Sequence, residues 1–304
     1  MTSDTGTPAS QPAPPGSDLN LQDAKVLIDL FERAAQTNLE HPGRKGAVVN
    51  LPDVGRLLMT GDLHDNGLNF QRIWKLARLH RDPQHYLVLH ELIHGPGRIN
   101  GRDLSIRTLA RAVAGQLDHP QQVIPLLANH DLAQLGGEGI LKAGVSVVEA
   151  FDQGVDFLYG DDADAVREAM NQYVRSMPLA IRCANGVFCS HSLPSPRKIE
   201  TFDKSVLDRV PTDEDLAIDG PGYLMVWGRH HTQKVADELA EAWNAKVFVM
   251  GHQPADMGYE VEGDTMLVLN SDHEHGVALP INLAKTYTRD DLVMQIVPLA
   301  AVTL

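Results

Sequence analysis

Short apolar runs alternate with amphipathic stretches along the first half of the chain. Leu27, Leu30 and Phe31 fall on one face of residues 21–36, a spacing that predicts a helix. Further helices are expected over residues 70–81, 104–117 and most of 143–176, and strands over 56–60, 86–89 and 123–128. Alternation of strands and helices is typical of an α/β fold with parallel strand pairs.

The second half of the chain has more short β-like runs. Apolar runs over 179–182 and 187–189 flank Asn185-Gly186, and Asn-Gly is a strong signal for a hairpin turn. Residues 233–244 have helical periodicity, and strands are expected over 246–250, 265–269 and 276–283. We expect one folded domain over residues 19–304.

The first 18 residues differ from the rest. They include Pro8, Pro12 and Pro14, contain no Lys or Arg, and carry no bulky apolar side chain beyond Met1. Such a segment cannot bury enough apolar surface to fold, so the sequence predicts a disordered tail over 1–18. It also lacks the positive start and apolar middle of a secretory signal, so we expect a cytoplasmic protein.

Composition narrows the classes of function. The 26 Lys and Arg residues face 40 Asp and Glu residues, a formal net charge of −14 that opposes binding to nucleic acid or to anionic membranes. Two cysteines are too few for a disulfide-stapled scaffold. No apolar run approaches the ~18 residues of a membrane helix. Fourteen histidines fit either a metal site or a scatter of surface histidines.

Five of the apolar runs end in residues that can bind metal ions. These are Asp62 and His64, His90 and Glu91, Asn129 with His130 and Asp131, His191, and His252. Because ligands of α/β sheets lie beyond the carboxyl ends of the strands, we expect these side chains to converge. Imidazole nitrogen and carboxylate oxygen suit zinc, iron and manganese, while the absence of a cysteine cluster argues against iron–sulfur or all-thiolate zinc sites.

The spacing allows two metal ions. Asp62 and His64 are two residues apart in an extended segment, so they point the same way and could hold one ion. A second ion could be held by Asn129, His191 and His252. Two ions ~3.5–4 Å apart need a shared ligand, and a carboxylate has two oxygens for that purpose. His130, beside a ligand, could act as general acid on a leaving oxygen.

The order of these motifs along the chain resembles that of the calcineurin-like metallophosphoesterases. The motifs are GDLH at 61–64, the acidic Glu91, ANHD at 128–131, SHS at 190–192 and GHQ at 251–253. The resemblance runs from about residue 56 to 283. It is greatest to the phosphoprotein phosphatase branch, through PLAIRCANGVFCSHSLPS at 178–195 and GHQPADMGYE at 251–260. It implies an α/β fold of four layers, an α/β/β/α sandwich of two mixed sheets flanked by helices.

The resemblance also implies a site and a reaction. The implied ligands are Asp62, His64 and Glu91 for a first ion and Glu91, Asn129, His191 and His252 for a second, with Mn, Fe or Zn as the metal. The implied catalytic group comprises His130 as proton donor, Asp131 beside it, and Arg229 near a substrate-binding arginine of the family. A hydroxide bridging the ions would attack a phosphate monoester, carried by a protein or a small metabolite. Dinucleoside polyphosphates and phosphodiesters are alternative substrates.

The sequence departs from the family pattern at several positions. Glu91 replaces the bridging aspartate, and His94 stands where the family has the aspartate that orients the catalytic histidine. Gly95 stands at the position of a phosphate-binding arginine, and no arginine precedes Asn129. The arginines that could supply the phosphate contact are Arg98, Arg102 and Arg229.

Residues 90–94, HELIH, also fit the HExxH motif of zinc proteases. That motif requires a helix, on which His90 and His94 share a face and Glu91 activates water. A protease would leave the other four motifs unexplained. A third possibility is a phosphoesterase fold that binds metal without turnover, since the usual arginines are missing.

Overall fold

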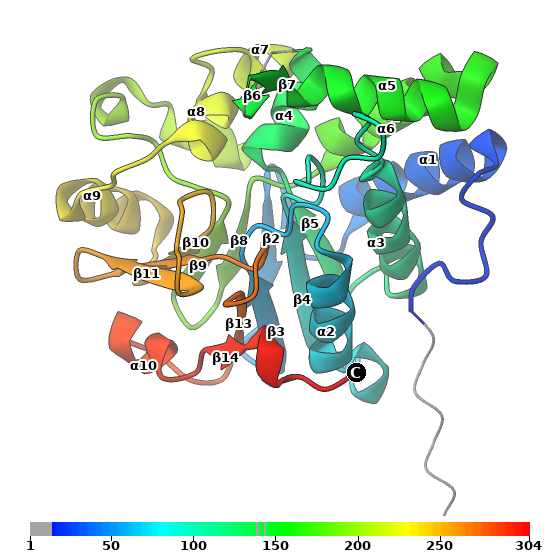
Figure 1. The fold of residues 1–304 in the computed structure, drawn as a ribbon. Coiled ribbons are helices and arrows are strands. Elements are labelled where there is room, and N and C mark those ends of the chain that lie inside the picture. Colours follow the sequence, from blue (N-terminus) through cyan, green and yellow to red (C-terminus); the bar gives the residue numbers. More distant parts are fainter. Residues whose placement is uncertain (1–13, 138–139, 143) are drawn as a thin grey trace, which may run out of the picture.

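Two mixed β-sheets pack face to face at the centre of the molecule (Figure 1). The computed structural model describes residues 14–137, 140–142 and 144–304. In this part of the chain the larger sheet has seven strands, in the order β1-β2-β8-β9-β10-β12-β11. Their bounds are Arg44–Lys45, Val48–Leu51, Ala180–Cys183, Val187–Ser190, Val247–Met250, Met266–Leu269 and Tyr259–Glu262, in that order. β9, β10 and β12 run parallel to one another.

The second sheet has five strands in the described residues, in the order β14-β13-β3-β4-β5. Their bounds are Val297–Pro298, Val277–Asn282, Arg56–Thr60, His85–His90 and Val123–Leu126. β3, β4 and β5 are parallel, so their carboxyl ends open at one edge of the sheet. A separate two-stranded ribbon consists of β6 (Leu141–Lys142) and β7 (Val145–Ser146).

The strands are apolar on both faces because both faces are buried. Leu57 and Met59 of β3 belong to the core between the sheets, whereas Leu58 belongs to the core under the helices. In β10, Val249 likewise belongs to the core between the sheets and Phe248 to the core under the helices. This alternation follows from the two-residue period of a strand. It explains why these segments appear in the sequence as continuous apolar runs.

Helices cover the outer faces of both sheets. Their bounds are α1 Ala24–Glu40, α2 Gly67–Ala77, α3 Ile106–Asp118, α4 Asn129–Gly136, α5 Val147–Tyr159, α6 Ala163–Ser176, α7 Asp213–Leu216, α8 Pro221–Trp227, α9 Gln233–Trp243 and α10 Arg289–Val293. α2 and α3 pack on the five-stranded sheet. On the other sheet, Trp243 of α9 stacks on Phe188 of β9, with 5.0 Å between ring centroids. The expected four-layer α/β/β/α sandwich is confirmed.

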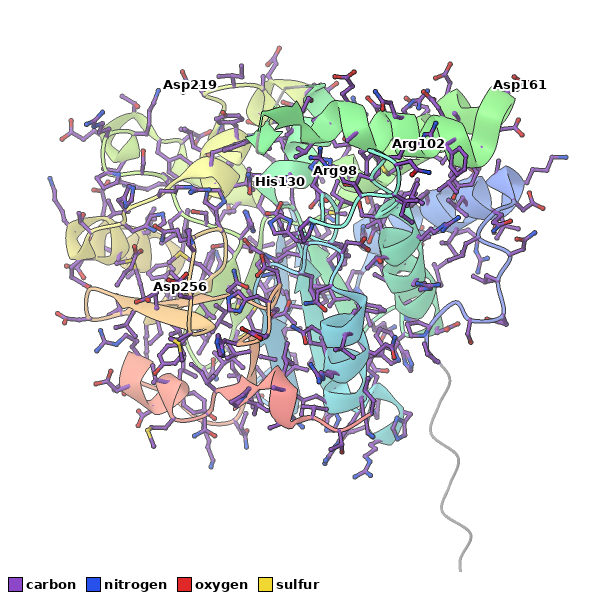
Figure 2. All side chains as sticks on the ribbon, viewed as in Figure 1. Arg98, Arg102, His130, Asp161, Asp219 and Asp256 are labelled. Atoms are coloured by element: carbon purple, nitrogen blue, oxygen red, sulfur yellow. The ribbon has the colours of Figure 1, made fainter. Side chains whose placement is uncertain are left out.

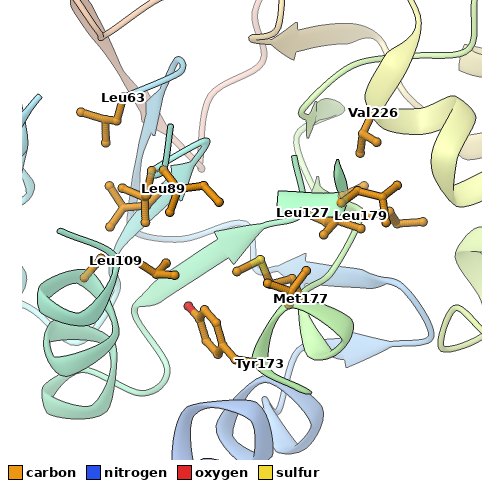
Figure 3. Close-up of a cluster of buried hydrophobic side chains, with 14 of the residues drawn as sticks. Leu63, Leu89, Leu109, Leu127, Tyr173, Met177, Leu179 and Val226 are labelled. Atoms are coloured by element: carbon orange, nitrogen blue, oxygen red, sulfur yellow. The ribbon is translucent and has the colours of Figure 1, made fainter. Parts of the chain in front are cut away.

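A continuous apolar core joins the helices to the five-stranded sheet. Leu89 of β4 and Leu109 of α3 lie in it together with Tyr173 of α6 (Figure 3). The ring of Tyr173 in turn lies 5.7 Å from that of Phe31 in α1. These contacts fix the helices against the sheet whose strand ends carry the predicted ligands.

Most of the predicted elements are confirmed, with small shifts of their ends. Residues 56–60 form β3, and Asn185-Gly186 joins the antiparallel strands β8 and β9. The first helix begins at Ala24 rather than residue 21, because the Asp23 carboxylate caps it by accepting from the Lys25 backbone N–H. The sequence pattern missed β2, a four-residue strand in which Asn50 interrupts the apolar run.

The last residues of the predicted tail belong to the described part of the chain. Residues 1–13 lie outside the described residues, but Pro15 and Gly16 are buried. They pack on α3, where a Cβ at Gly115 would lie 2.9 Å from Pro15 Cβ. The proline-rich composition gave no indication of this contact. The contact requires glycine at position 115, because a side chain there would collide with Pro15. No helix in the described part of the chain has the length and apolar character needed to cross a bilayer.

Candidate metal centre

The carboxyl ends of strands from both sheets bring the predicted ligands to one place. β3 precedes Asp62 and His64, β4 precedes Glu91, β5 leads to Asn129 at the start of α4, β9 precedes His191, and β10 precedes His252. All but His64 are buried. The two sheets therefore contribute complementary halves of a single polar centre.

Four atoms that can bind a metal ion lie close together, and one of them is Nε2 of His191. This atom lies 2.8 Å from Asn129 Oδ1 and 2.9 Å from Glu91 Oε2. It also lies 3.2 Å from His252 Nδ1, and that atom is 2.9 Å from Asn129 Oδ1. These are the four residues predicted for the second ion, and the structure brings all of them together.

His90 determines how His191 presents its nitrogen atoms. His90 Nε2 lies 2.8 Å from the carbonyl oxygen of Thr60, which can only accept, so this nitrogen carries the hydrogen. The neutral ring then has its lone pair on Nδ1, 2.9 Å from His191 Nδ1. His191 therefore donates from Nδ1 and keeps its lone pair on Nε2. Burial lowers the pKa of His90 to about 3 and that of His191 to about 4, consistent with neutral rings.

Asp62 lies beside the same pair of rings. Its Oδ1 atom is 3.8 Å from His90 Nδ1 and 3.7 Å from His191 Nδ1. The backbone N–H of His252 donates to both Asp62 oxygens, at 2.9 and 3.1 Å. Burial raises the pKa of the Asp62 carboxyl to about 7. Glycine is needed at position 251, because a Cβ there would lie 2.3 Å from Asp62 Oδ1.

Glu91 belongs to two groups of possible ligands. In the first group, the possible metal-binding atoms of Glu91, His191 and His252 lie within 4.8 Å of one another. In the second group, those of Glu91, His64 and His130 do so. Glu91 Oε1 accepts from the backbone N–H of His130 at 3.1 Å, while Oε2 faces His191. A carboxylate shared by two ions requires this division of its oxygens.

The two residues predicted as the first ligand pair lie in different groups of possible ligands. Asp62 shares its group with His90 and His191, and not with His64, in the described residues. His64 instead directs Nδ1 to the carbonyl oxygen of Ile93, at 3.0 Å, and its ring lies 4.9 Å from that of His130. The extended spacing assumed for Asp62 and His64 is not present, since His64 has a positive φ of 41°.

Left-handed backbone conformations are concentrated at this site. His64, Glu91, His94 and His252 have φ values between 41° and 69°. Each costs a non-glycine residue about 1 kcal/mol or more, and such strain persists where the surrounding structure fixes it. Two hydrogen bonds fix it here, because the backbone N–H groups of Leu63 and His64 both donate to the carbonyl oxygen of Glu91, at 3.1 and 2.7 Å.

The centre opens on a cavity of about 310 Å³. Arg229 lines it, and is the only Lys or Arg among the described residues to do so. Its Nε donates to His252 Nε2 at 3.0 Å. Arg98 and Arg102 lie on the loop after β4 (Figure 2) and do not line the cavity. The guanidinium of Arg102 instead lies 4.6 Å from the centroid of the Phe157 ring.

The structure explains two of the departures from the family pattern. No side chain fits at Gly95, because a Cβ would lie 2.5 Å from Asp65 Cβ and 2.7 Å from the carbonyl oxygen of His64. His94 is buried and directs Nδ1 to His130 Nδ1 at 2.9 Å. An imidazole thus contacts the predicted general acid at the position where the family has a carboxylate.

Asp131 lies at the start of α4 rather than against the cavity. Its Oδ2 atom accepts from the backbone N–H of Ala128 at 3.2 Å, so the carboxylate caps the helix. Burial raises the pKa of Asp131 well above its ordinary value, and the charge of Glu91 raises it further. Asp131 is not among the residues that line the cavity. His130, in contrast, does line it.

The donor set fits divalent metal ions. The lone pair of His191 Nε2 faces oxygen atoms of Glu91 and Asn129, and neither oxygen can donate a hydrogen bond. A cation stabilises three lone pairs that converge in this way, which in the metal-free chain face only the hydrogen on His252 Nδ1. Nitrogen and oxygen ligands without sulfur suit zinc, iron and manganese.

Comparison of the sequence with known families agrees with this chemistry. The sequence model of the calcineurin-like phosphoesterases matches residues 55–276, a span that contains every candidate ligand described above. The chain belongs to this family. It is therefore a phosphoester hydrolase, and its family implies divalent metal ions. No curated protein matches it by sequence.

Solved structures of two phosphatases share the fold of this phosphoesterase. One is a protein serine/threonine phosphatase from Saccharomyces cerevisiae with similarity to human phosphatase PP5, at 13% identity and a TM-score of 0.66, covering 91% of this chain and 93% of the other. The second is the cold-active protein-tyrosine phosphatase of a psychrophilic Shewanella species, at 14% identity and a TM-score of 0.53, covering 82% and 80%. At these identities the likeness concerns the fold.

The HExxH alternative is wrong for this phosphoesterase. His90 is the last residue of strand β4, and Glu91 and His94 have positive φ values, so residues 90–94 are not helical. The two histidines consequently point to different partners, His191 and His130. A zinc-protease site needs both on one helical face.

Sequence reasoning placed His90 at the strand ends but gave it no role in the centre. The two-residue period of a strand could have indicated such a role. His90 is two residues after Val88 in β4, and Val88 faces the second sheet. His90 therefore also faces the second sheet, where His191 follows β9. The pairing itself depends on how the two sheets pack, and no local pattern encodes that.

Proposed function

We propose that this phosphoesterase hydrolyses phosphate monoesters, carried by a protein side chain or by a small metabolite. The observation that supports the proposal is the position of Glu91, whose two oxygens face separate groups of ligands beside His130. A shared carboxylate with a proton donor next to it is the arrangement that two-metal phosphoester hydrolysis requires.

Each group of side chains has a distinct role in this proposal. Asp62, His64 and Glu91 would hold one ion, and Glu91, Asn129, His191 and His252 the other. When bound, manganese, iron or zinc would polarise the phosphoryl oxygens and lower the pKa of a water molecule that attacks phosphorus. His130 gives a proton to the leaving oxygen. Arg229 binds a phosphate oxygen through its guanidinium group.

The charges around the cavity favour a monoester over a polyphosphate. Asp256 and Asp272 line the cavity together with Arg229, the one Lys or Arg of the described residues there (Figure 2 shows Asp256). A leaving group with further phosphates would meet these carboxylates, and like charges repel. The two phosphatases of similar fold are named as a serine/threonine and a tyrosine phosphatase, so the fold accommodates both kinds of ester.

The test combines metal analysis with turnover. Purified protein loaded with manganese should contain two ions per chain and hydrolyse p-nitrophenyl phosphate. Asp62→Ala and His252→Ala should lower the metal content and abolish turnover. His80→Ala serves as the matched control, because His80 is exposed and belongs to the short helix Leu79–Arg81 away from the centre.

The outcomes separate the remaining alternatives. Two bound ions without turnover of either p-nitrophenyl phosphate or bis-p-nitrophenyl phosphate would contradict the proposal and favour a non-catalytic metal protein. Faster hydrolysis of the diester would replace the monoester by a phosphodiester as the substrate class.

A further inference from the structure

A chain of three side chains extends from His130 away from the cavity. His94 Nδ1 lies 2.9 Å from His130 Nδ1, and His94 Nε2 lies 3.0 Å from Gln134 Oε1. Gln134 Nε2 donates to Asp152 Oδ1 at 2.9 Å. Gln134 is one helical turn after His130 in α4, and Asp152 belongs to α5. His94, His130 and Gln134 are all buried.

The hydrogen-bond partners determine where each proton lies. The Asp152 oxygen faces the amide of Gln134, so Gln134 donates from Nε2 and presents Oε1 to His94. Oε1 can only accept, and His94 therefore carries its hydrogen on Nε2. A neutral His94 ring with its hydrogen on Nε2 has its lone pair on Nδ1. His130 then donates to it from Nδ1.

Nε2 is the nitrogen of His130 that does not face His94. Nδ1 is occupied by His94, and the ring lines the cavity near His64 and Glu91. The ring of His94 is itself held edge-on against Phe151 of α5, with centroids 5.5 Å apart. The chain thus fixes both the orientation of His130 and the nitrogen that faces the substrate.

We propose that Gln134 and Asp152 are positioning residues that act on the general acid through His94. The inference rests on the proposed function, in which His130 protonates the leaving group. As the phosphorus–oxygen bond breaks, its electron pair goes to the leaving oxygen, which takes the proton from Nε2 of His130 in its imidazolium form. His130 is left neutral with its hydrogen on Nδ1, the tautomer that His94 accepts from. The attacking water supplies the new phosphate oxygen and releases a proton to solvent.

The test compares leaving groups in Gln134→Leu. A leaving group such as phenol needs protonation, whereas 2,4-dinitrophenol does not. We expect kcat for phenyl phosphate to fall about 10- to 100-fold and kcat for 2,4-dinitrophenyl phosphate to stay within about twofold. Gln153→Leu is the matched control, because Gln153 is the exposed neighbour of Asp152 on α5. Metal content is measured in each variant.

A second variant and a spectroscopic readout keep the inference open to refutation. Asp152→Ala leaves the Gln134 amide free to turn and should show the same leaving-group dependence if Gln134→Leu does not fold. Long-range ¹H–¹⁵N spectra of the metal-free protein should show His130 with its hydrogen on Nδ1, and a mixture of tautomers in the variants. Equal losses on both esters, or an unchanged His130 tautomer, would overturn the inference.

The two proposals fail in different ways. An inactive native protein would contradict the proposed function, and the tautomer of His130 would then still decide whether the chain positions that ring. An active native protein whose variants respond equally to both leaving groups would contradict the positioning role alone.

Discussion

The Nδ1 atoms of His90 and His191 lie 2.9 Å apart, and this contact orients His191, a proposed ligand of the candidate metal centre. His90 accepts at Nδ1 because its Nε2 donates to the carbonyl oxygen of Thr60. His191 consequently directs a lone pair from Nε2 toward Glu91. Histidine ligands commonly donate their other N–H to a fixed acceptor, which sets the ring orientation. Here that acceptor is a second imidazole.

Replacing His90 should weaken metal binding. In His90→Leu, His191 loses its acceptor and can adopt the other tautomer, so we expect affinity for manganese or zinc to fall about 10- to 100-fold. Isothermal titration of the metal-free protein measures this change. The control is His85→Leu at the opposite end of β4, which should bind as the native protein does. An unchanged affinity in His90→Leu would show that His191 needs no such partner.

Adding one methyl group at Gly251 should disrupt the centre. A Cβ there would lie 2.3 Å from Asp62 Oδ1 and 2.6 Å from His90 Cε1, so both side chains would have to move. We expect Gly251→Ala to lose bound metal and about 1–3 kcal/mol of stability. Gly97→Ala is the matched control, since a Cβ added there would meet no described atom within 4 Å beyond its chain neighbours. Metal analysis and urea unfolding check both, and full metal content in Gly251→Ala would refute the packing explanation.

Strand ends were predictable from the sequence because they combine two local signals. An apolar run marks a strand, and a polar residue after it marks the edge where ligands gather. This reasoning located Asn129, His191 and His252 without any knowledge of how the sheets pack, and the structure brings their donor atoms together.

The finer geometry was not predictable, because it depends on contacts between distant segments. The left-handed conformation of His64 removes the extended spacing that would have aligned it with Asp62. Gln134 and Asp152 look like ordinary polar residues of amphipathic helices in the sequence. Their link to His94 arises only when α4 and α5 pack over the loop after β4.

Asp62 should make the stability of the metal-free protein depend on pH. Burial raises its pKa from 3.8 to about 7, so the folded chain holds this proton more tightly than the unfolded chain. The contribution of Asp62 is therefore most favourable below pH 4, declines as the pH rises to about 7, and then stays constant. Asn at this position keeps an oxygen acceptor for the His252 N–H without the charge.

We accordingly expect Asp62→Asn to stabilise the metal-free protein by up to about 4 kcal/mol at pH 8 and much less near pH 4.5. Urea unfolding in the presence of a chelator measures both values. Asp256→Asn, at an exposed carboxylate on the cavity rim, should show no such difference between the two pH values. A stabilisation of Asp62→Asn that is equal at both pH values would contradict the raised pKa.

The phosphate-binding arginines that are usual in the family are missing from this chain, so Arg229 should contribute most of the contact to the phosphate. A charge-assisted hydrogen bond is worth about 1.5–3 kcal/mol, so Arg229→Gln should lower kcat/KM for p-nitrophenyl phosphate about 10- to 100-fold. Because Arg229 also donates to His252, metal content must be shown to be unchanged. Arg98→Gln and Arg102→Gln, which alter arginines outside the cavity, should have little effect. If either of these lowered kcat/KM as much as Arg229→Gln, the loop after β4 would carry the phosphate contact instead.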